Sequence, residues 1–278
     1  MVMIKQYFRQ ALYELKVHPL LSAISIIGTA LAICLIMVLV VMQQVKVVPF
    51  YPETNRDRTL HVKYVSNQRT GNNAGYSNNG PMSMKVGREC FRRLTIPEAV
   101  TLYSYPDEML LSVPAASAIT VEVKQTDEQF WNVFQFTFID GRPFDEAESE
   151  AGLPVAVVSE SVAREVLGSA QIAGELLRLN YTEYTVSGVV KDVSTLASSA
   201  YGQVWIPYYS TDLVRSDGDL SGSFMAAILA YDRNDFFAIR QQAEQLRLNL
   251  MTRWMSVKYF TGINPMIRKW LWRENGPI

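Results

Sequence analysis

The chain has 278 residues and a formal net charge of −1, which argues against nucleic acid as its main partner because phosphate neutralisation needs a clustered basic excess. Two histidines and two cysteines are too few for a metal site rich in either residue, and Cys90 is best explained as a small buried apolar side chain. A hydrophobic fraction of 49%, with 11% aromatic residues, excludes a disordered chain.

Residues 1–18 have the spacing of a cytoplasmic amphipathic helix. One face carries apolar side chains at helical intervals, with polar and basic ones on the other. These apolar residues are Ile4, Phe8, Leu12 and Leu15. We expect this helix to lie on the inner surface of the membrane until the chain turns at Pro19. The alternative is an ordinary flanking segment with accidental periodicity.

Residues 19–46 predict a transmembrane helix. No charged residue lies between Lys16 and Lys46, and Leu20 to Met42 is a nearly continuous apolar run. At about 1.5 Å per residue this run makes a helix of about 34 Å, enough to cross a hydrocarbon core of about 30 Å. A cleaved signal peptide has a shorter apolar core, of about 7–15 residues, and small residues at its cleavage site. No such site follows Met42.

The charges that flank the span predict its orientation. Lys5, Arg9 and Lys16 precede it, whereas Lys46 alone follows closely. The positive-inside rule therefore favours a cytoplasmic N-terminus and an exported remainder, with the chain crossing the membrane once.

Small residues occupy one face of the predicted span. They are Ser25, Gly28, Thr29 and Ala32, at positions i, i+3, i+4 and i+7. Such a face lets a second helix approach closely, although small residues are common in membrane helices and the spacing has chance as its alternative explanation.

Residues 47–278 predict one globular domain of mixed α+β structure. Apolar alternation indicates strands at 60–64, 118–124, 154–158, 175–179, 183–191, 204–206 and 224–231. Helices are predicted at 126–134 with Asp127 near its start, at 159–168 with Ser159 as cap, and at 236–250 with one buried stripe. The Asn- and Gly-rich stretch 67–80 predicts a surface loop. The mixture indicates at least one mixed sheet.

The predicted domain contains no recognisable catalytic, cofactor or metal motif. The acidic residues at 145–150 lack the spacing of a calcium-binding loop and predict a solvated turn, as does Asp217-Gly218-Asp219. Ser159 and Ser161 lie in no nucleophile elbow, and the chain has no phosphate-binding loop of its own. We therefore name no catalytic, cofactor-binding or metal-ligating residue and expect the chain not to be an enzyme.

Several short signatures follow the span in order. They are the stretches 55–60 (NRDRTL), 127–134 (DEQFWNVF), 141–144 (GRPF), 155–163 (VAVVSESVA) with Leu167-Gly168 and Gly174, and 186–192 (VSGVVKD) with 204–207 (VWIP). In this order, after one membrane helix, they resemble the periplasmic core domain of MacB/FtsX-type ABC transporter permeases. The resemblance covers nearly the whole chain.

The resemblance implies a mechanical coupler and its partners. A separate cytoplasmic ABC ATPase subunit would bind ATP, and the permease would carry its motion to the periplasmic domain for export or for regulation of the envelope. The implied assembly is a homodimer or a paired permease, with a periplasmic adaptor as a further partner. The family pattern continues with three more spans, whereas this sequence stops at Ile278, so we expect a truncated or split permease subunit.

Two other classes of protein are alternatives. A single-pass sensor or adaptor that binds an envelope partner would explain the span and the missing catalytic groups, but not the ordered signatures. A membrane-anchored hydrolase is disfavoured by the residue inventory.

Overall fold

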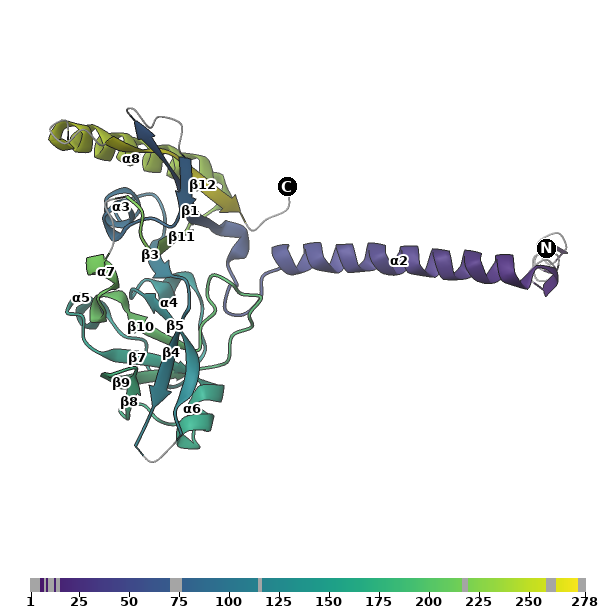
Figure 1. Cartoon of the computed structure of the whole chain (residues 1–278), viewed down its shortest axis with the longest axis horizontal. Helices are drawn as coiled ribbons and strands as arrows, with labels where there is room; N and C mark the ends of the chain where they lie inside the picture. The colour runs from purple at the N-terminus through teal and green to yellow at the C-terminus, as the bar shows by residue number, and fades with distance from the viewer. Residues whose placement is uncertain are drawn as a thin grey trace. The chain divides into compact units, whose positions relative to one another are not determined.

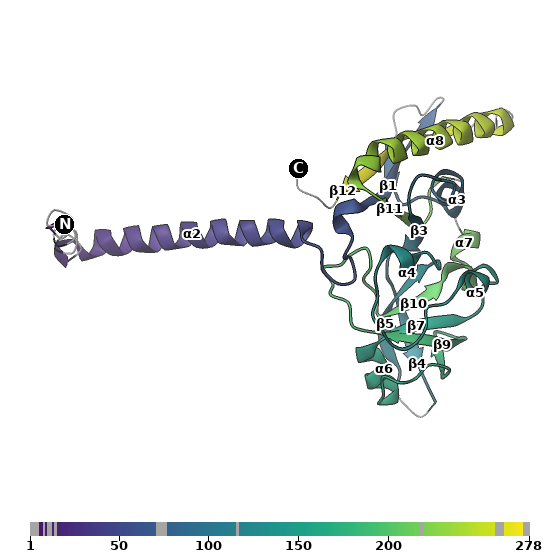
Figure 2. The ribbon, with the colours of Figure 1, turned by 180° about the vertical axis from the view of Figure 1, so that it is seen from behind.

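The computed structural model describes residues 6–7, 9, 13, 16–70, 77–114, 117–216, 220–258 and 264–274. Its internal contacts divide the chain into two compact units, Met1–Val48 and Pro49–Ile278. Figure 1 and, from behind, Figure 2 show one long helix in the first unit and a sheet-rich domain in the second.

Helix α2, Pro19–Val47, is the main element of the first unit. Proline is well placed in its first turn, where the missing amide hydrogen costs no helical hydrogen bond. The stretch Pro19–Gln44 contains an 18-residue window with a mean hydropathy of 2.9 and is long and apolar enough to cross a membrane, at about 1.5 Å per residue. The residues of the predicted amphipathic face, Ile4, Phe8, Leu12 and Leu15, lie outside the described part of the chain.

Part of the second unit is a small closed barrel. Strand β5 pairs with β4 on one side and with β10 on the other, so that six strands form a ring in the order β5, β10, β7, β9, β8 and β4. Their bounds are β4 Asp107–Ser112, β5 Ile119–Thr126, β7 Val155–Ser159, β8 Leu176–Leu179, β9 Thr182–Val190 and β10 Val204–Pro207. The interior is filled by small and branched apolar side chains such as Val121, Val158 and Val186.

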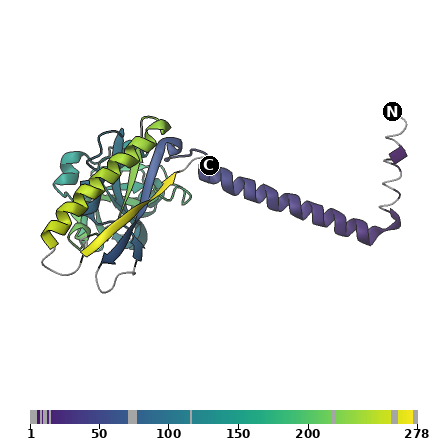
Figure 3. The ribbon, with the colours of Figure 1, turned by 90° about the horizontal axis from the view of Figure 1, so that it is seen from above.

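The sheet continues from β5 as an antiparallel layer. Its strands are β3 Ala99–Ser104, β11 Phe224–Leu229, β1 Thr59–Thr70 and β12 Asn264–Glu274, with β2 Ser77–Gly80 paired to β1. Helices α3 (Met84–Cys90) and α8 (Phe236–Lys258) pack on this layer, and Figure 3 shows α8 beside β12. The stripe predicted for α8 is confirmed, since Phe236, Ile239 and Leu250 are buried.

An aromatic cluster joins the barrel to the antiparallel layer. It is centred on α4 (Phe130–Val133) and on the chain that leads into β6 (Phe138–Gly141). Trp131 makes edge-to-face contacts with Phe136 and Trp205 at ring-centroid distances of 5.1 and 6.3 Å. These aromatic side chains form part of the core, with Trp205 buried and with Trp131 and Phe136 partly buried against it. The remaining short elements are α5 Glu146–Glu150, α6 Glu160–Leu167, α7 Leu213–Ser216, η1 Arg56–Arg58, η2 Tyr208–Ser210 and η3 Arg233–Asp235.

Single residues explain several local features, and the predicted burial of Cys90 is confirmed. Gly168 ends α6 with a φ of 71°, and Asn180, at a φ of 52°, turns the β8–β9 hairpin. Gly141 has a φ of 64°, and a Cβ there would lie 2.2 Å from the carbonyl oxygen of Ser187, so only glycine fits this close approach. Cys90 is fully buried, and burial raises the pKa of its thiol to about 12.

Other local predictions were wrong, and long-range pairing explains why. The predicted loop 67–80 instead contains the end of β1 and strand β2, whose residues Ser77–Gly80 pair with Val65–Gln68 through backbone hydrogen bonds that need no apolar side chains. Strand β12 was missed because its partner, β1, lies about 200 residues away in sequence. The acidic residues at 145–150 form the short helix α5 with a capping box rather than a turn.

Two predicted helix caps also fail. The carboxylate of Asp127 accepts hydrogen bonds from Thr101 Oγ1 (2.6 Å) and Leu102 N (2.9 Å) in β3, and α4 begins beyond it. Ser159 has the backbone conformation of a cap, but its side chain makes no capping hydrogen bond to α6. Its hydroxyl lies 3.4 Å from that of Ser161 instead.

Candidate functional site at the junction after the span

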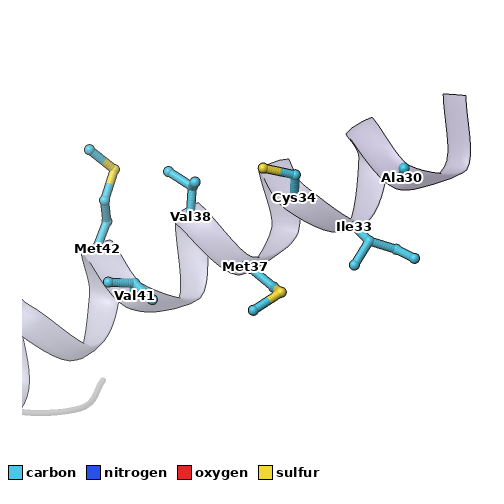
Figure 4. Close-up of a pocket in the computed structure, with 7 residues that line it drawn as sticks. All are labelled: Ala30, Ile33, Cys34, Met37, Val38, Val41 and Met42. Carbon is cyan, nitrogen blue, oxygen red and sulfur yellow. The ribbon is translucent and has the colours of Figure 1, made fainter. Parts of the chain in front are cut away.

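No metal centre is seen within the described residues, where no group of three or more His, Cys, Asp or Glu side chains could hold an ion. An apolar groove is lined by seven residues of α2 alone (Figure 4): Ala30, Ile33, Cys34, Met37, Val38, Val41 and Met42. Figure 4 shows these side chains projecting from a single helix, so the groove is the surface of α2 rather than an enclosed site.

The predicted small-residue face also lies on α2. Ser25, Gly28, Thr29 and Ala32 are exposed on one side of the helix, and nothing lies within 4 Å of the position of a Cβ on Gly28. Thr29 Oγ1 lies within hydrogen-bond distance of the carbonyl oxygens of Ser25 (2.9 Å) and Ile26 (3.0 Å), so the hydroxyl bonds within its own helix. At about 100° per residue, this face is opposite the groove of Figure 4.

A different set of polar contacts begins where the span ends. We call residues 49–58 the junction segment. Only Val48 and Pro49 lie between the end of α2 and Phe50, which is the first residue of this segment in a β-bridge. Glu53 and Arg56 are both buried in it, and Arg56 Nε donates to Glu53 Oε2 at 2.6 Å. The guanidinium group of Arg56 also lies 4.1 Å from the ring centroid of Phe50.

A second segment, residues 191–203, covers this ion pair, and we call it the strap. The backbone N–H groups of Ser199 and Ala200 donate to Glu53 Oε1 at 3.1 and 3.2 Å. Arg56 Nη2 donates to the carbonyl oxygen of Leu196 at 3.4 Å. Each member of the pair is thus bonded to its partner and to the strap, as a buried charge requires.

The junction segment is fastened on two further sides. On the first side, Gln135 N donates to Pro52 O at 2.9 Å, and Thr137 N donates to the hydroxyl of Tyr51 at 3.1 Å. Burial raises the pKa of that Tyr51 hydroxyl. On the other side, Arg58 Nη1 donates to Ala230 O at 2.7 Å, just beyond β11. The strap, the segment that leads from α4 into β6, and the end of β11 are therefore all hydrogen-bonded to the residues that follow the span.

Beneath the strap lies a fully buried lysine, Lys124 of β5. Its ammonium group donates to the carbonyl oxygen of Ser199 at 3.1 Å and lies 5.0 Å from the ring centroid of Tyr103. Burial, and then the charge of Lys63, lower the pKa of Lys124 to about 7, while Glu53 and Glu122 act in the opposite direction. An ammonium group without water around it is costly, so this position is unusual.

Neither the ion pair nor the lysine was named as a site residue from the sequence. Arg56 belongs to a signature that carried the family resemblance, and the i, i+3 spacing of Glu53 and Arg56 is the local signal that was available. Lys124 had no such signal, because its partner Ser199 is 75 residues away. The turn at 217–219, predicted to be solvated, lies outside the described part of the chain.

Comparisons with known proteins agree with this architecture. The family model of the MacB-like periplasmic core domain matches residues 22–246. A domain assigned to a permease protein from Porphyromonas gingivalis shares 16% identity at a TM-score of 0.56, with 81% of this chain and 94% of that one covered. The periplasmic region of MacB from Actinobacillus actinomycetemcomitans shares 18% identity at a TM-score of 0.50, with 78% and 90% covered.

The likeness to these two structures concerns the fold, whereas the family match covers most of the sequence. No curated protein matches the chain in a sequence search. The predicted fold class is confirmed, with an apolar N-terminal helix followed by a mixed α+β domain. This chain belongs to the family of MacB-like periplasmic core domains, which are parts of ABC-type permeases of the inner membrane.

Proposed function

We propose that this chain is a permease subunit of a MacB/FtsX-type ABC transporter, in which the junction segment passes the motion of α2 to the exported domain. A separate cytoplasmic ATPase binds and hydrolyses ATP. The resulting motion of the exported domain drives export of a substrate or regulates a partner in the envelope. The observation that carries the proposal is the fastening of residues 49–58 immediately after the span.

Mechanical transmission needs a stiff connection, since a flexible linker absorbs displacement as a change in its own conformation. Here the connection is short, and the proline at position 49 restricts the backbone of Val48. The next charged side chains that are buried are those of Glu53 and Arg56, and separating a buried ion pair is strongly unfavourable. A displacement at the end of α2 is therefore transferred to the strap and the sheet.

The placement in the membrane follows from the flanking charges. In the proposal the N-terminus is cytoplasmic and residues 47–278 are periplasmic, an orientation that the basic residues before the span support. The small-residue face of α2 packs against a second span, in a homodimer or in a paired permease. ATP is bound by the ATPase, and this chain carries no catalytic or cofactor-binding residue in the proposal.

The second candidate is a single-pass adaptor whose exported domain binds an envelope protein. The observation that favours it is that one helix long and apolar enough to span a membrane is found within the described residues. An adaptor also needs no ATPase. The adaptor hypothesis does not explain the many hydrogen bonds of the junction segment, because a tethered binding domain works equally well on a flexible linker.

Purification of the tagged full chain from its native host in a gentle detergent, followed by mass spectrometry, separates the two candidates. Recovery of an ATPase with a phosphate-binding loop, or of a polypeptide that carries further spans, is the result expected for a transporter subunit. Recovery of the chain with envelope proteins only, or alone, would contradict the coupling function and favour the adaptor.

A further inference from the structure

Lys124 and Glu53 are connected through one peptide group of the strap. The carbonyl oxygen of Ser199 accepts from the ammonium group of Lys124, and the N–H of the same peptide group, on Ala200, donates to Glu53 Oε1. The amino group of Lys124 and the carboxylate of Glu53 thus bind the same peptide group from its two ends. The hydrogen bond to the Glu53 carboxylate is charge-assisted, and neighbouring hydrogen bonds in a chain reinforce one another.

Charged groups of both signs surround Lys124. From the junction segment Glu53, which is paired with Arg56, acts on its charge, and β5 contributes Glu122. From β1, Lys63 donates to the hydroxyl of Ser198 at 3.3 Å. Other titratable groups beside the strap and the lysine are His61, whose Nδ1 lies 3.4 Å from Ser199 Oγ, and three tyrosines. These are Tyr103, Tyr51, whose hydroxyl donates to Lys191 O at 3.3 Å, and Tyr201, which is hydrogen-bonded to Glu122.

The strap lies against Lys124 at both ends of its side chain. A Cβ on Gly202 would lie 3.2 Å from Cβ of Lys124, so the strap passes directly over the lysine stem. Within the described residues, none of the ion pairs includes Lys124. Lifting the strap would therefore give the ammonium group the solvation that it lacks in the closed structure.

We propose that protonation of Lys124 releases the strap from the junction segment. Opening of the strap takes up a proton at Lys124, and closing of the strap gives it back to water. The proposal rests on the coupling function proposed for the junction segment and names its regulation. When the strap lifts, Glu53 loses the two N–H donors of Ser199 and Ala200, and the domain loosens its hold on the residues after the span.

The sign of the pH effect follows from linkage. The pKa of Lys124 is about 7 in the closed structure and returns toward 10.5 when the strap is open and the side chain is in water. Between these values the open form binds the extra proton, so lowering the pH favours opening, by up to about tenfold per pH unit. Below about pH 7 the lysine is protonated in both forms, and the equilibrium no longer depends on its titration.

Hydrogen exchange of the full chain in detergent micelles tests this release. We expect peptides that cover residues 195–203 to exchange more slowly as the pH rises from 7 to 9, after correction for intrinsic exchange, by several-fold per pH unit. Lys124→Met removes this dependence. Lys191→Met, at an exposed lysine where the strap begins, is the matched control and retains it. A wild-type strap without the dependence, or a Lys124→Met strap that keeps it, would overturn the proposal.

A second measurement covers the case in which Lys124→Met does not fold. Lysine side chains of the wild-type full chain are labelled with ¹³C and titrated by NMR in the same micelles. One lysine is expected to titrate near pH 7, and its assignment to Lys124 follows from its absence in Lys124→Arg. If every lysine titrates near pH 10, the proposal fails. Because neither measurement uses the ATPase, failure of the release is distinguishable from failure of the coupling function.

Discussion

Replacement of Glu53 by glutamine removes the charge at the centre of the junction while keeping its shape. The amide oxygen still accepts from Ser199 N and Ala200 N, but Arg56 loses its anionic partner at 2.6 Å. The side chains of Glu53 and Arg56 are only 3% and 7% exposed, so water cannot compensate. Breaking a buried ion pair by removing one partner costs about 3–5 kcal/mol, which sets the expected loss of unfolding free energy.

Thermal and urea denaturation of the full chain in detergent measure this loss. For a domain of about 230 residues, about 1 kcal/mol shifts Tm by roughly 2–4 °C, so we expect Glu53→Gln to lower Tm by about 10 °C. Asp57→Asn is the matched control, because Asp57 is exposed on the neighbouring turn η1 and should change stability by less than about 0.5 kcal/mol.

A double variant distinguishes the ion pair from general damage to the junction. In Glu53→Gln/Arg56→Met no buried cation is left uncompensated at this position, so the combined loss should be smaller than the sum of the two single losses by about 1–3 kcal/mol. Strict additivity, or a Glu53→Gln variant as stable as Asp57→Asn, would refute the assignment of Glu53 and Arg56 as a buried, energetically coupled pair.

Three further predictions concern the glycine turn, the span and the lysine. Gly141→Ala should lose at least about 2 kcal/mol of unfolding free energy by urea titration, because its Cβ meets a backbone oxygen at 2.2 Å. Gly168→Ala, with open space around its Cβ, should lose about 1 kcal/mol. Equal losses in the two variants would contradict the close approach at Gly141. Gly28→Leu should disrupt helix packing, seen as loss of complexes in mild detergent, while Ala30→Leu on the opposite side should not. Unchanged complexes with Gly28→Leu would count against the small-residue face. The pKa of Lys124 is about 7 in the folded chain and 10.5 in the unfolded chain, so the unfolded chain binds more protons between these values. The unfolding free energy of the wild type should therefore rise by up to about 1.4 kcal/mol per pH unit relative to Lys124→Met between pH 7 and 9. Parallel pH profiles would disprove this linkage.

Local periodicity predicted those parts of the fold that depend on local burial. The alternation of Val121 and Val123 in β5, and the stripe of α8, follow from one face meeting one core, so composition and spacing were sufficient. The closure of the barrel was not predicted, because it depends on the pairing of β5 with β10 across about 80 residues. The same holds for β12, which pairs with β1 across the length of the domain.

The candidate site was predictable only in part. The small-residue face of α2 could be named from spacing alone, although its packing stays a prediction. The junction segment depends on a strap about 140 residues away in sequence, and a lone lysine in a strand ordinarily indicates a solvent-facing position. Burial of Lys124 arises from the strap that crosses it, which no local pattern around residue 124 encodes.

The central claim is that the junction segment transmits motion as a stiff connection. Its most direct test inserts a flexible Gly-Ser-Gly-Ser stretch between Val48 and Pro49 in the complex recovered with its ATPase, and measures hydrogen exchange of residues 49–278 with and without ATP. The account predicts an ATP-dependent change in protection at the strap and the junction segment in the wild type, and its loss on insertion. The same ATP-dependent change in both proteins would contradict transmission through the junction.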